Sequence, residues 1–223
     1  MKVNLVGYTQ PVNSEIIGIY DVQDLIVYCA RVSNPKGQEI MEYASCEKLL
    51  SYLIRNKHWS PFELASATLE VETTRDVARQ LLRHRSFSFQ EFSQRYADPA
   101  LFENQFVLRE ARLQDHKNRQ NSIDTDNEVL QAAWKAKQQA CIDLAKSTYD
   151  WAIENGIAKE QARVVLPEGN TTSRLYVNGT IRSWIHYIEL RTENGTQKEH
   201  IELAKEIAKS ISKIFPMVEA TNL

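Results

Sequence analysis

The chain has 223 residues, a formal net charge of −2, 43% hydrophobic residues and 25% charged residues. This length predicts one domain, residues 1–223, with a sizeable core, and the composition is ordinary for a soluble globular protein. The negative charge argues against a basic, nucleic-acid-binding coat. The sequence shows no charged-then-apolar leader and no bilayer-spanning apolar run, so we expect a cytoplasmic protein.

The predicted elements are mainly helices, because Gly and Pro number only seven and six. In chain order, the first half is expected to form a strand at 2–8, helices near 21–32 and 39–56, a strand at 64–72, and a helix from a Thr73–Asp76 capping pattern through 85. The second half is expected to begin with an irregular loop region at 86–123 that has possible short strands. After it we expect a helix at 127–155 ending at Gly156, a short helix before Pro167, a strand at 174–177, a helix at 181–191 ending near Gly195, and a helix at 197–214. The fold class is therefore α+β, helix-rich, with a small, mainly antiparallel sheet.

The three cysteines are Cys29, Cys46 and Cys141, which are far apart and form no CxxC motif. Their odd number and spacing predict reduced thiols that pack in the core of a cytoplasmic protein. Cys46 and Cys141 lie inside helical patterns, where a packed thiol is more common than a catalytic one.

Positive charge is concentrated before and within RHRSFSFQEFSQRY, residues 83–96. Arg75, Arg79 and Arg83 are four residues apart, so one helix would place them on one face. Like charges at that spacing repel by about 0.2–0.5 kcal/mol per pair. A solvated arginine stripe is one interpretation, and a bound phosphate is the other.

The residues that follow favour the phosphate. Arg85, Ser93 and Arg95 supply guanidinium forks and a hydroxyl, which suit phosphate oxygens. Aromatic residues alternate with polar ones here, and core packing and stacking on a heterocycle both stay open for Phe87, Phe89, Phe92 and Tyr96.

This stretch resembles the signature of flavin-dependent thymidylate synthases, an RHR triplet followed at a fixed distance by a Ser and an Arg-Tyr pair. Three further blocks resemble the family in order and approximate spacing. They are NKHWSPFE at 56–63, ARVVLP at 162–167 and RSWIHYIELRTENGTQKEH at 182–200. Four ordered blocks make the match far more specific than a lone RHR.

The resemblance implies a homotetrameric enzyme that makes dTMP from dUMP, with active sites shared between chains. Methylenetetrahydrofolate supplies the carbon, NADPH supplies the reducing equivalents, and FAD relays both. No metal, nucleic acid or membrane is implied. The family needs no protein thiolate, which agrees with the unreactive settings expected for the cysteines.

The resemblance also implies a cofactor-binding set in which the RHR triplet contacts FAD and a second group lies around the last long block. The set is His58, Ser60, Arg83, His84, Arg85, Glu91, Thr180, Ile181, Arg182 and His186. Arg182 and His186 are one helical turn apart, so they can face one ligand. Thr180 stands where the family often has Asn, and Asn178 lies two residues earlier.

The substrate-binding set implied for dUMP is Gln80, Leu81, Leu82, Arg83, Glu91, Phe92, Ser93, Gln94, Arg95, Arg163 and Arg191. The Gln80 amide can pair with a uracil edge, although a surface glutamine is the commoner case. Glu91 beside a phosphate has to pair with an arginine or accept a sugar hydroxyl or a flavin N–H. Arg163 lies between apolar residues, and a half-buried arginine requires an anionic partner. The resemblance implies that the dUMP of a neighbouring site is this partner.

Arg191 is the predicted catalytic residue. It follows Trp184, Tyr187 and Ile188 at i, i+3, i+4 and i+7 spacing. An arginine at a helix C-terminus can simply complement the helix dipole, worth less than ~1 kcal/mol. The family's activating arginine aligns here, and a guanidinium in a partly dry pocket would stabilise the anion formed when uracil N3 loses its proton, which increases electron density at C5.

Two other functions remain open from the sequence. Arginines interleaved with aromatic residues are also typical of an RNA- or single-strand-binding module. An FAD-binding protein without synthase activity would keep the same motifs. A flavin absorbance band would favour the enzyme, and a colourless protein that shifts RNA would favour the binding module.

Overall fold

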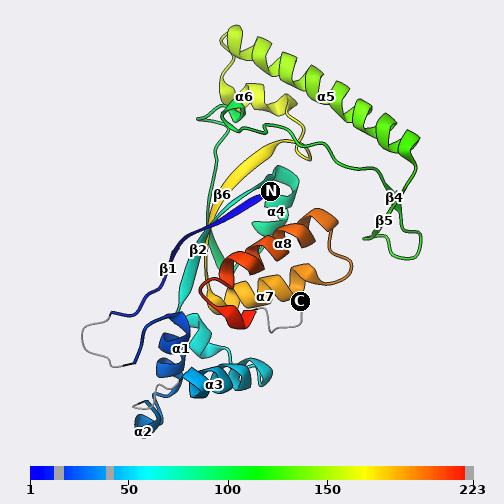
Figure 1. Cartoon of the computed structure of the whole chain (residues 1–223). Coiled ribbons are helices and arrows are strands. Elements are labelled where there is room, and N and C mark those ends of the chain that lie inside the picture. The colour runs from blue at the N-terminus through cyan, green and yellow to red at the C-terminus, as the bar shows by residue number, and fades with distance from the viewer. Residues whose placement is uncertain (13–17, 39–42, 219–223) are drawn as a thin grey trace.

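A four-stranded antiparallel sheet organises the computed structural model, which describes residues 1–12, 18–38 and 43–218 (Figure 1). In spatial order its strands are β1 (Lys2–Tyr8), β2 (Ser66–Thr74), β6 (Thr172–Thr180) and β3 (Phe87–Glu91). The three expected strands are confirmed, and β3 lies in the region expected to be irregular with possible short strands. A separate two-stranded sheet joins β4 (Arg112–Gln114) and β5 (Ser122–Asp124).

The described residues form eight α-helices, which confirms the helix-rich α+β class. They are α1 (Val22–Ala30), α2 (Pro35–Gln38), α3 (Tyr43–Arg55), α4 (Arg75–Leu81), α5 (Glu128–Glu154), α6 (Lys159–Ala162), α7 (Ile181–Thr192) and α8 (Lys198–Ile211). Short 3₁₀ turns are η1 (Ser60–Glu63), η2 (Pro99–Leu101), η3 (Arg163–Val165) and η4 (Pro216–Val218). The first residues of the helix expected at 39–56 lie outside the described part of the chain, and α2 was not expected.

Helix α4 begins later and ends earlier than its sequence pattern predicts. Strand β2 pairs with β6 as far as Thr74, so Thr74 rather than Thr73 is the N-cap. Its hydroxyl donates to Asp76 Oδ1 at 2.6 Å and caps no backbone N–H. The helix ends at Leu81, and the RHR triplet at 83–85 therefore lies in the turn between α4 and β3.

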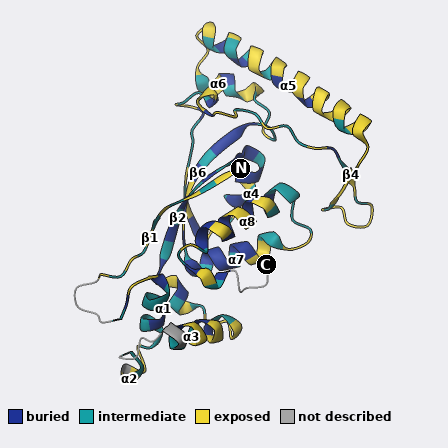
Figure 2. Ribbon diagram, in the orientation of Figure 1, coloured by how far each residue is buried: buried dark blue, intermediate teal, exposed yellow. Residues whose placement is uncertain are grey.

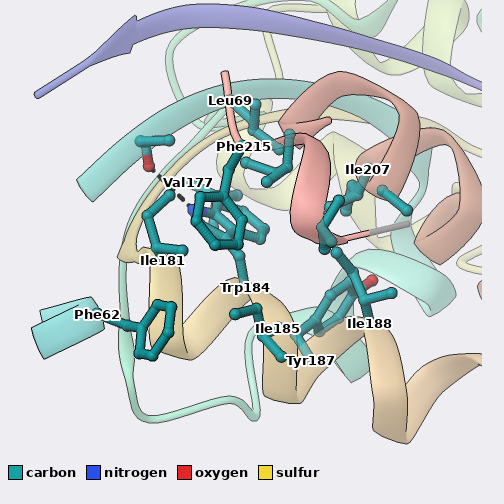
Figure 3. Close-up of a cluster of buried hydrophobic side chains, with 14 of the residues drawn as sticks. Phe62, Leu69, Val177, Ile181, Trp184, Ile185, Tyr187, Ile188, Ile207 and Phe215 are labelled. Carbon is teal, nitrogen blue, oxygen red and sulfur yellow. Dashed lines mark hydrogen bonds between the residues drawn. The ribbon is translucent and has the colours of Figure 1, made fainter. Parts of the chain in front are cut away.

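The main core lies between the sheet and helices α7 and α8 (Figure 3). Trp184, Tyr187 and Ile188 are buried there, as their spacing predicts. Trp184 Nε1 donates to the Ala67 carbonyl at 3.2 Å, so its one polar atom is satisfied. Burying an Ile or Phe side chain contributes roughly 1.5–3 kcal/mol, and this core therefore fixes α7 firmly against the sheet.

The start of β3 is set by a close approach between Phe87 and Gly179. The two residues are paired across β3 and β6. A Cβ atom on Gly179 would lie 2.2 Å from the Phe87 ring, which no real side chain tolerates. Only glycine lets the edge of this ring come so close to β6, and this contact fixes where the turn at 83–85 emerges.

Helix α5 lies at the opposite end of the molecule from α1 and α3, and most of its surface is exposed (Figures 1 and 2). Cys141 lies on α5 off its buried stripe and is exposed, so the expectation of a packed thiol is wrong there. Cys46 is buried and Cys29 is half-buried. Burial raises the pKa of both these thiols, which keeps them protonated at neutral pH.

Candidate active site

Helix α7 carries predicted site residues on two opposite faces. Arg182 and His186 are one turn apart on its outer face, where both are half-buried. Arg191 lies about half a turn around the axis from them, on the side of the buried Tyr187. Residues assigned from the sequence to the flavin and to dUMP therefore lie on separate faces of this helix.

The first group is the η1 cluster, made of His58, Ser60, Arg182 and His186. Arg182 forms an ion pair with Glu63, the last residue of η1. His186 packs edge-on against Trp59, with ring centroids 4.6 Å apart, and burial lowers the pKa of its imidazole. His58 and Ser60 are exposed beside these contacts in sequence. Segments more than a hundred residues apart are thus brought together on the outer face of α7.

Two other predicted flavin contacts are used by the fold itself. The Thr180 hydroxyl caps α7 by accepting the backbone N–H of Ser183 at 3.2 Å. The Ile181 side chain is fully buried in the core. Asn178, the other candidate for the family's Asn position, donates to Thr68 Oγ1 at 2.8 Å on the sheet. These side chains are already engaged, and their assignment to a ligand remains a prediction.

The second group is the His84 cluster, made of Gln80, His84 and Arg191. Arg191 Nε donates to His84 Nε2 at 2.9 Å, so His84 offers a lone pair there and carries its proton on Nδ1. Burial and the positive charge of Arg191 lower the pKa of His84 to about 4. The imidazole is therefore neutral at pH 7. In the described part of the chain the terminal nitrogens of Arg191 have no acceptor, which leaves them available to a ligand.

Gln80 belongs to a hydrogen-bonded series that the sequence did not indicate. His200 is fully buried on α8, and its Nδ1 lies 3.1 Å from Gln80 Oε1. Its Nε2 lies 3.0 Å from the Tyr187 hydroxyl. Gln80 Nε2 donates to Gln197 Oε1 at 2.7 Å, and Gln197 Nε2 donates to Glu199 Oε2 at 2.8 Å. We call these five residues the buried polar chain; it links α4, α7 and the start of α8.

Glu199 ends this chain as a carboxylate. It forms ion pairs with Arg109 and Arg112. Burial alone would raise the pKa of Glu199, but the hydrogen bonds from Arg112 and Gln197 and the charge of Arg109 lower it to about 2. Burial is also the main cause that lowers the pKa of His200 to about 3, with smaller contributions from the charges of Arg191 and His84.

The remaining residues around the RHR triplet differ in their surroundings. Leu81 is buried in the core and Leu82 packs against it, so neither side chain is free to bind a ligand. Arg83 and Arg85 are exposed, and within the described chain their guanidinium groups meet no acceptor. They are the two cations of the triplet region that a bound anion can still use.

The third group is the α6 cluster, made of Ser93, Gln94, Arg95 and Arg163. Arg95 Nη2 lies 3.4 Å from Glu160 Oε2, and Lys159 Nζ donates to the Tyr96 carbonyl at 3.3 Å. These contacts bring the loop after β3 to α6, which leads directly to Arg163 on η3. Gln94 is buried, and its Nε2 has no hydrogen-bond partner among the described residues.

The aromatic residues of the signature mostly pack in the fold. Phe87 is buried against Trp184, with ring centroids 4.4 Å apart. Phe92 packs against Phe102 at 4.7 Å. Tyr96 is 77% exposed and is the one of the four that stands clear of the core.

Carboxylates compensate two of the helical arginines. Arg75 Nε and Arg79 Nε donate to the two oxygens of Glu168 at 3.1 and 2.9 Å. Glu91 accepts the Ser173 hydroxyl at 2.9 Å and lies 3.6 Å from Arg75 Nη1. Arg75 and Arg79 therefore need no bound phosphate to explain them, and Glu91 follows the arginine-pairing alternative.

Strand β3 separates the His84 cluster from the α6 cluster. The turn that holds His84 precedes Phe87, and the loop that holds Arg95 follows Glu91. Five residues of strand place these ends about 13 Å apart. Periodicity along the sequence did not show this separation, because the prediction for this region allowed short strands without placing any of them.

Residues 15–217 match the family described as "Thymidylate synthase complementing protein". A probable flavin-dependent thymidylate synthase of Paramecium bursaria Chlorella virus 1 is 50% identical over 218 residues, covering 98% of this chain and 97% of that protein. A flavin-dependent thymidylate synthase of Synechocystis sp. is 46% identical over 223 residues, covering 99% and 98%.

Among solved structures, the UMP/dUMP methylase PolB from Streptomyces cacaoi, bound with 5-Br dUMP, has a TM-score of 0.78 at 28% identity, covering 97% of this chain and 92% of that chain. Sequence and fold thus agree over nearly the whole length, and the four blocks first noticed as motifs lie inside the matched region. The chain belongs to the flavin-dependent thymidylate synthases, a family of methyltransferase enzymes.

Proposed function

We propose that this enzyme catalyses the reductive methylation of dUMP to dTMP, with methylenetetrahydrofolate as carbon donor, NADPH as reductant and FAD as cofactor. The family supports the flavin and the product, and the solved methylase bound with 5-Br dUMP supports the nucleotide. The observation that carries the proposal is the pair of Arg191 and His84, in which a neutral imidazole holds a guanidinium whose terminal nitrogens are free to bind a ligand.

Arg191 would activate the uracil ring. Uracil C5 is a poor nucleophile until negative charge builds on the ring, as it does when N3 loses its proton. A permanently charged guanidinium stabilises that anion without a proton of its own to lose at neutral pH. His84 contributes by accepting from Nε, which fixes the plane of the fork; a protonated imidazole could not accept there.

The residues assigned to FAD fit a group with a diphosphate and flat rings. Arg83 and Arg85 are exposed cations without partners in the described chain, and diphosphate oxygens suit such forks. Among the described residues Arg182 forms an ion pair only with exposed Glu63, a contact of the kind that contributes little to stability and can be exchanged for a ligand. When bound, FAD supplies the transfer of reducing equivalents, and these residues hold and orient it.

We also propose a homotetramer in which active sites are shared between copies. The separation of about 13 Å along β3 supports this, because one nucleotide has to meet both the His84 cluster and the α6 cluster. Helix α5 and η3 carry exposed apolar side chains that offer surface for such contacts. Two of them are Trp151, which is 58% exposed, and Val164, which is 82% exposed.

We assign residues 1–223 to one domain of this enzyme and place it in the cytoplasm. A single large hydrophobic cluster connects α1, α3, the sheet, α7 and α8, which supports one folding unit. The three cysteines are free, which suits a reducing compartment. Over the residues that the structure describes, no helix has the length and apolar character needed to cross a bilayer.

Release of hydrogen from C5 tests the reaction directly. Purified, flavin-loaded protein is mixed with C5-tritiated dUMP, NADPH and methylenetetrahydrofolate, and tritium in water is measured together with dTMP. We expect release that depends on all three small molecules. Flavin-loaded protein that releases no tritium would overturn the proposed reaction, and colourless protein that shifts RNA would favour a binding module instead.

A further inference from the structure

His200 is a buried titratable residue that the proposed reaction does not use. It lies on α8 with no exposed surface, and each ring nitrogen is within hydrogen-bond distance of a different helix. One neighbour is Gln80, on α4, and the other is Tyr187, on α7. A polar ring in this position would be costly without both partners, so its placement calls for a functional reading.

The direction of every hydrogen bond in the buried polar chain follows from Glu199. Because Glu199 has a pKa of about 2, its carboxylate can only accept, so Gln197 must donate to it through Nε2. Gln197 Oε1 then has to accept from Gln80 Nε2. The Glu199 carboxylate thus orients Gln197 and directs the Gln80 N–H towards it, while the Oε1 end of the Gln80 amide is held by its contact with His200.

The next contact along the buried polar chain fixes the proton of His200. Gln80 Oε1 faces His200 Nδ1, so the imidazole must carry its proton on Nδ1 and donate it. His200 Nε2 is left with a lone pair, which accepts from the Tyr187 hydroxyl. Its low pKa, about 3, agrees with this neutral form. Turning the Gln80 amide over would set two acceptors against each other, either Gln80 Oε1 and Gln197 Oε1 or, if Gln197 also turned over, Gln197 Oε1 and the Glu199 carboxylate.

A locked amide on Gln80 has a defined hydrogen-bonding capacity left over. Its Nε2 carries a second N–H, which no described residue of the protein accepts. Gln80 is also only half-buried. An N–H pairs with a ring carbonyl and is repelled by an amino group. Uracil has a carbonyl at C4, where cytosine has an amino group. An amide free to turn over would accept from cytosine through Oε1 and lose this distinction.

We propose that His200 is a positioning residue that, together with Gln197 and Glu199, holds the Gln80 amide with its N–H towards the base, so that the site selects uracil over cytosine. This inference rests on the proposed function, because it assumes that Gln80 faces the base of dUMP. The N–H would also stabilise the ring anion that Arg191 stabilises, since negative charge on the ring extends to the C4 oxygen. Tyr187 and Glu199 act as the two fixed ends of the chain.

Three variants of His200 separate its two contacts. The amide nitrogen of Asn occupies about the place of Nδ1, so His200→Asn keeps a donor for Gln80. The longer side chain of Gln reaches the place of Nε2, so His200→Gln keeps an acceptor for Tyr187 and loses the donor. His200→Leu keeps volume and removes both. Ser210→Ala is the matched control, because Ser210 is also buried on α8 but donates to the Val3 carbonyl at 3.5 Å, outside the chain.

Binding of dUMP and of dCMP to each flavin-loaded variant is measured by titration calorimetry, together with KM and kcat for dTMP formation. We expect His200→Leu and His200→Gln to lose about five- to tenfold of the preference for dUMP over dCMP, the size of one hydrogen bond. His200→Asn and Ser210→Ala should keep it. Equal preference in the Leu, Gln and Asn variants would overturn the inference, and if His200→Leu does not fold, the Gln and Asn pair decides alone.

A Gln80→Ala variant and the tritium-release assay separate the failures. If Gln80→Ala leaves dUMP binding unchanged, Gln80 does not face the base and the inference is wrong. If Gln80→Ala weakens binding while all His200 variants keep their preference, only the role of His200 is wrong. If the parental protein releases no C5 tritium yet loses its preference in His200→Leu, the proposed reaction fails and the inference stands.

Discussion

The His84 cluster and the α6 cluster lie at opposite ends of β3 and differ in how completely one chain satisfies them. At the first, Arg191 is held by His84, and both ring nitrogens of His200 are hydrogen-bonded. At the second, Gln94 Nε2 and the hydroxyl of Tyr149, which packs with α6, are buried without a hydrogen-bond partner in the described chain. An unpaired buried polar group costs about 1–3 kcal/mol.

This difference indicates which part of nucleotide recognition is prepared in advance. Donors that are already fixed need no rearrangement when charge develops on a ligand. Unsatisfied donors gain most when a ligand or a second copy arrives. We therefore expect selection of the base to be a property of the single chain, and phosphate binding to depend on assembly.

Removing Arg191 should have the largest effect on the His84 cluster, which is the end of β3 where the donors are already fixed. Arg191→Ala should keep its flavin and fold but lose about 10²–10³-fold in dTMP formation, as loss of one preorganised donor does, and should also bind dUMP more weakly. Arg191→Lys should recover only part, because an ammonium does not present a planar fork. Steady-state rates on flavin-loaded protein measure this. An alanine variant with the parental rate would leave Arg191 as a complement to the dipole of α7.

The same variant offers an internal control between the faces of α7. Loss of the Arg191 charge should raise the pKa of His84 from about 4, although burial still holds it below 6.5. The pKa of His186, which responds to Arg182 and Glu189 instead, should not change. Titration of the histidine signals by NMR would show this, and equal shifts of both would contradict the separation of the two faces.

A variant of Arg95 tests the α6 cluster, where polar groups lack partners within the described chain. Arg95→Ala should weaken dUMP binding by about ten- to a hundredfold, the roughly 1.5–3 kcal/mol of a charge-assisted contact, while FAD stays bound. Glu160→Ala is the control, because it removes only the ion-pair partner of Arg95 and should leave dUMP affinity unchanged or slightly higher. Unchanged dUMP affinity in Arg95→Ala, measured by calorimetry, would remove Arg95 from the site.

Acid should lower the free energy of unfolding through His200, in the buried polar chain beside the His84 cluster. His200 is neutral in the fold with a pKa of about 3, and an unfolded histidine titrates near 6.5, so below pH 6.5 the unfolded state binds more protons. The free energy of unfolding that His200 contributes above pH 6.5 is lost as the pH falls. The loss between pH 7 and pH 5 is about 2 kcal/mol for this residue. Urea unfolding at pH 7 and 5 measures the loss. His200→Leu should show a smaller loss than Ser210→Ala, and equal losses would contradict the prediction.

The RHR turn should give the smallest effect. Arg85→Ala should purify with severalfold less flavin and an unchanged circular-dichroism spectrum, because Arg85 is exposed and contacts no acceptor in the described chain. His84→Ala should also lose flavin, with an added loss of rate because His84 holds Arg191. Full flavin absorbance in both variants would count against the triplet as a cofactor contact.

Local pattern was enough to predict much of the fold. Strand β1 and the buried stripe of Trp184, Tyr187 and Ile188 follow directly from alternation and helical spacing. Gly156 and Gly195 lie just beyond the ends of α5 and α7, as expected. These features depend on residues that lie within a few positions of one another in the sequence. Hydrophobic periodicity detects relationships over that distance.

Contacts between distant segments were not predictable in this way. Glu168 neutralises Arg75 and Arg79 from about ninety residues further along the chain, so the helix looked more charged than it is. His200 follows Lys198 and Glu199 in a segment that reads as a solvated helix start, and only the packing of α8 on α7 buries it. The RHR turn and the loop after β3 looked adjacent in sequence, but a strand separates them.

The contact between Phe87 and Gly179 has a consequence for how this enzyme would respond to random mutation. Gly179 touches no proposed ligand, yet any side chain there would push β3 away from β6 and shift the turn that carries His84. The large core around Trp184 would hold the rest of the protein in place. In a screen scored by growth without thymidine, Gly179 would therefore rank with the catalytic residues although it performs no chemistry. Mutational sensitivity in this family would mark the supports of the active site as clearly as the site itself.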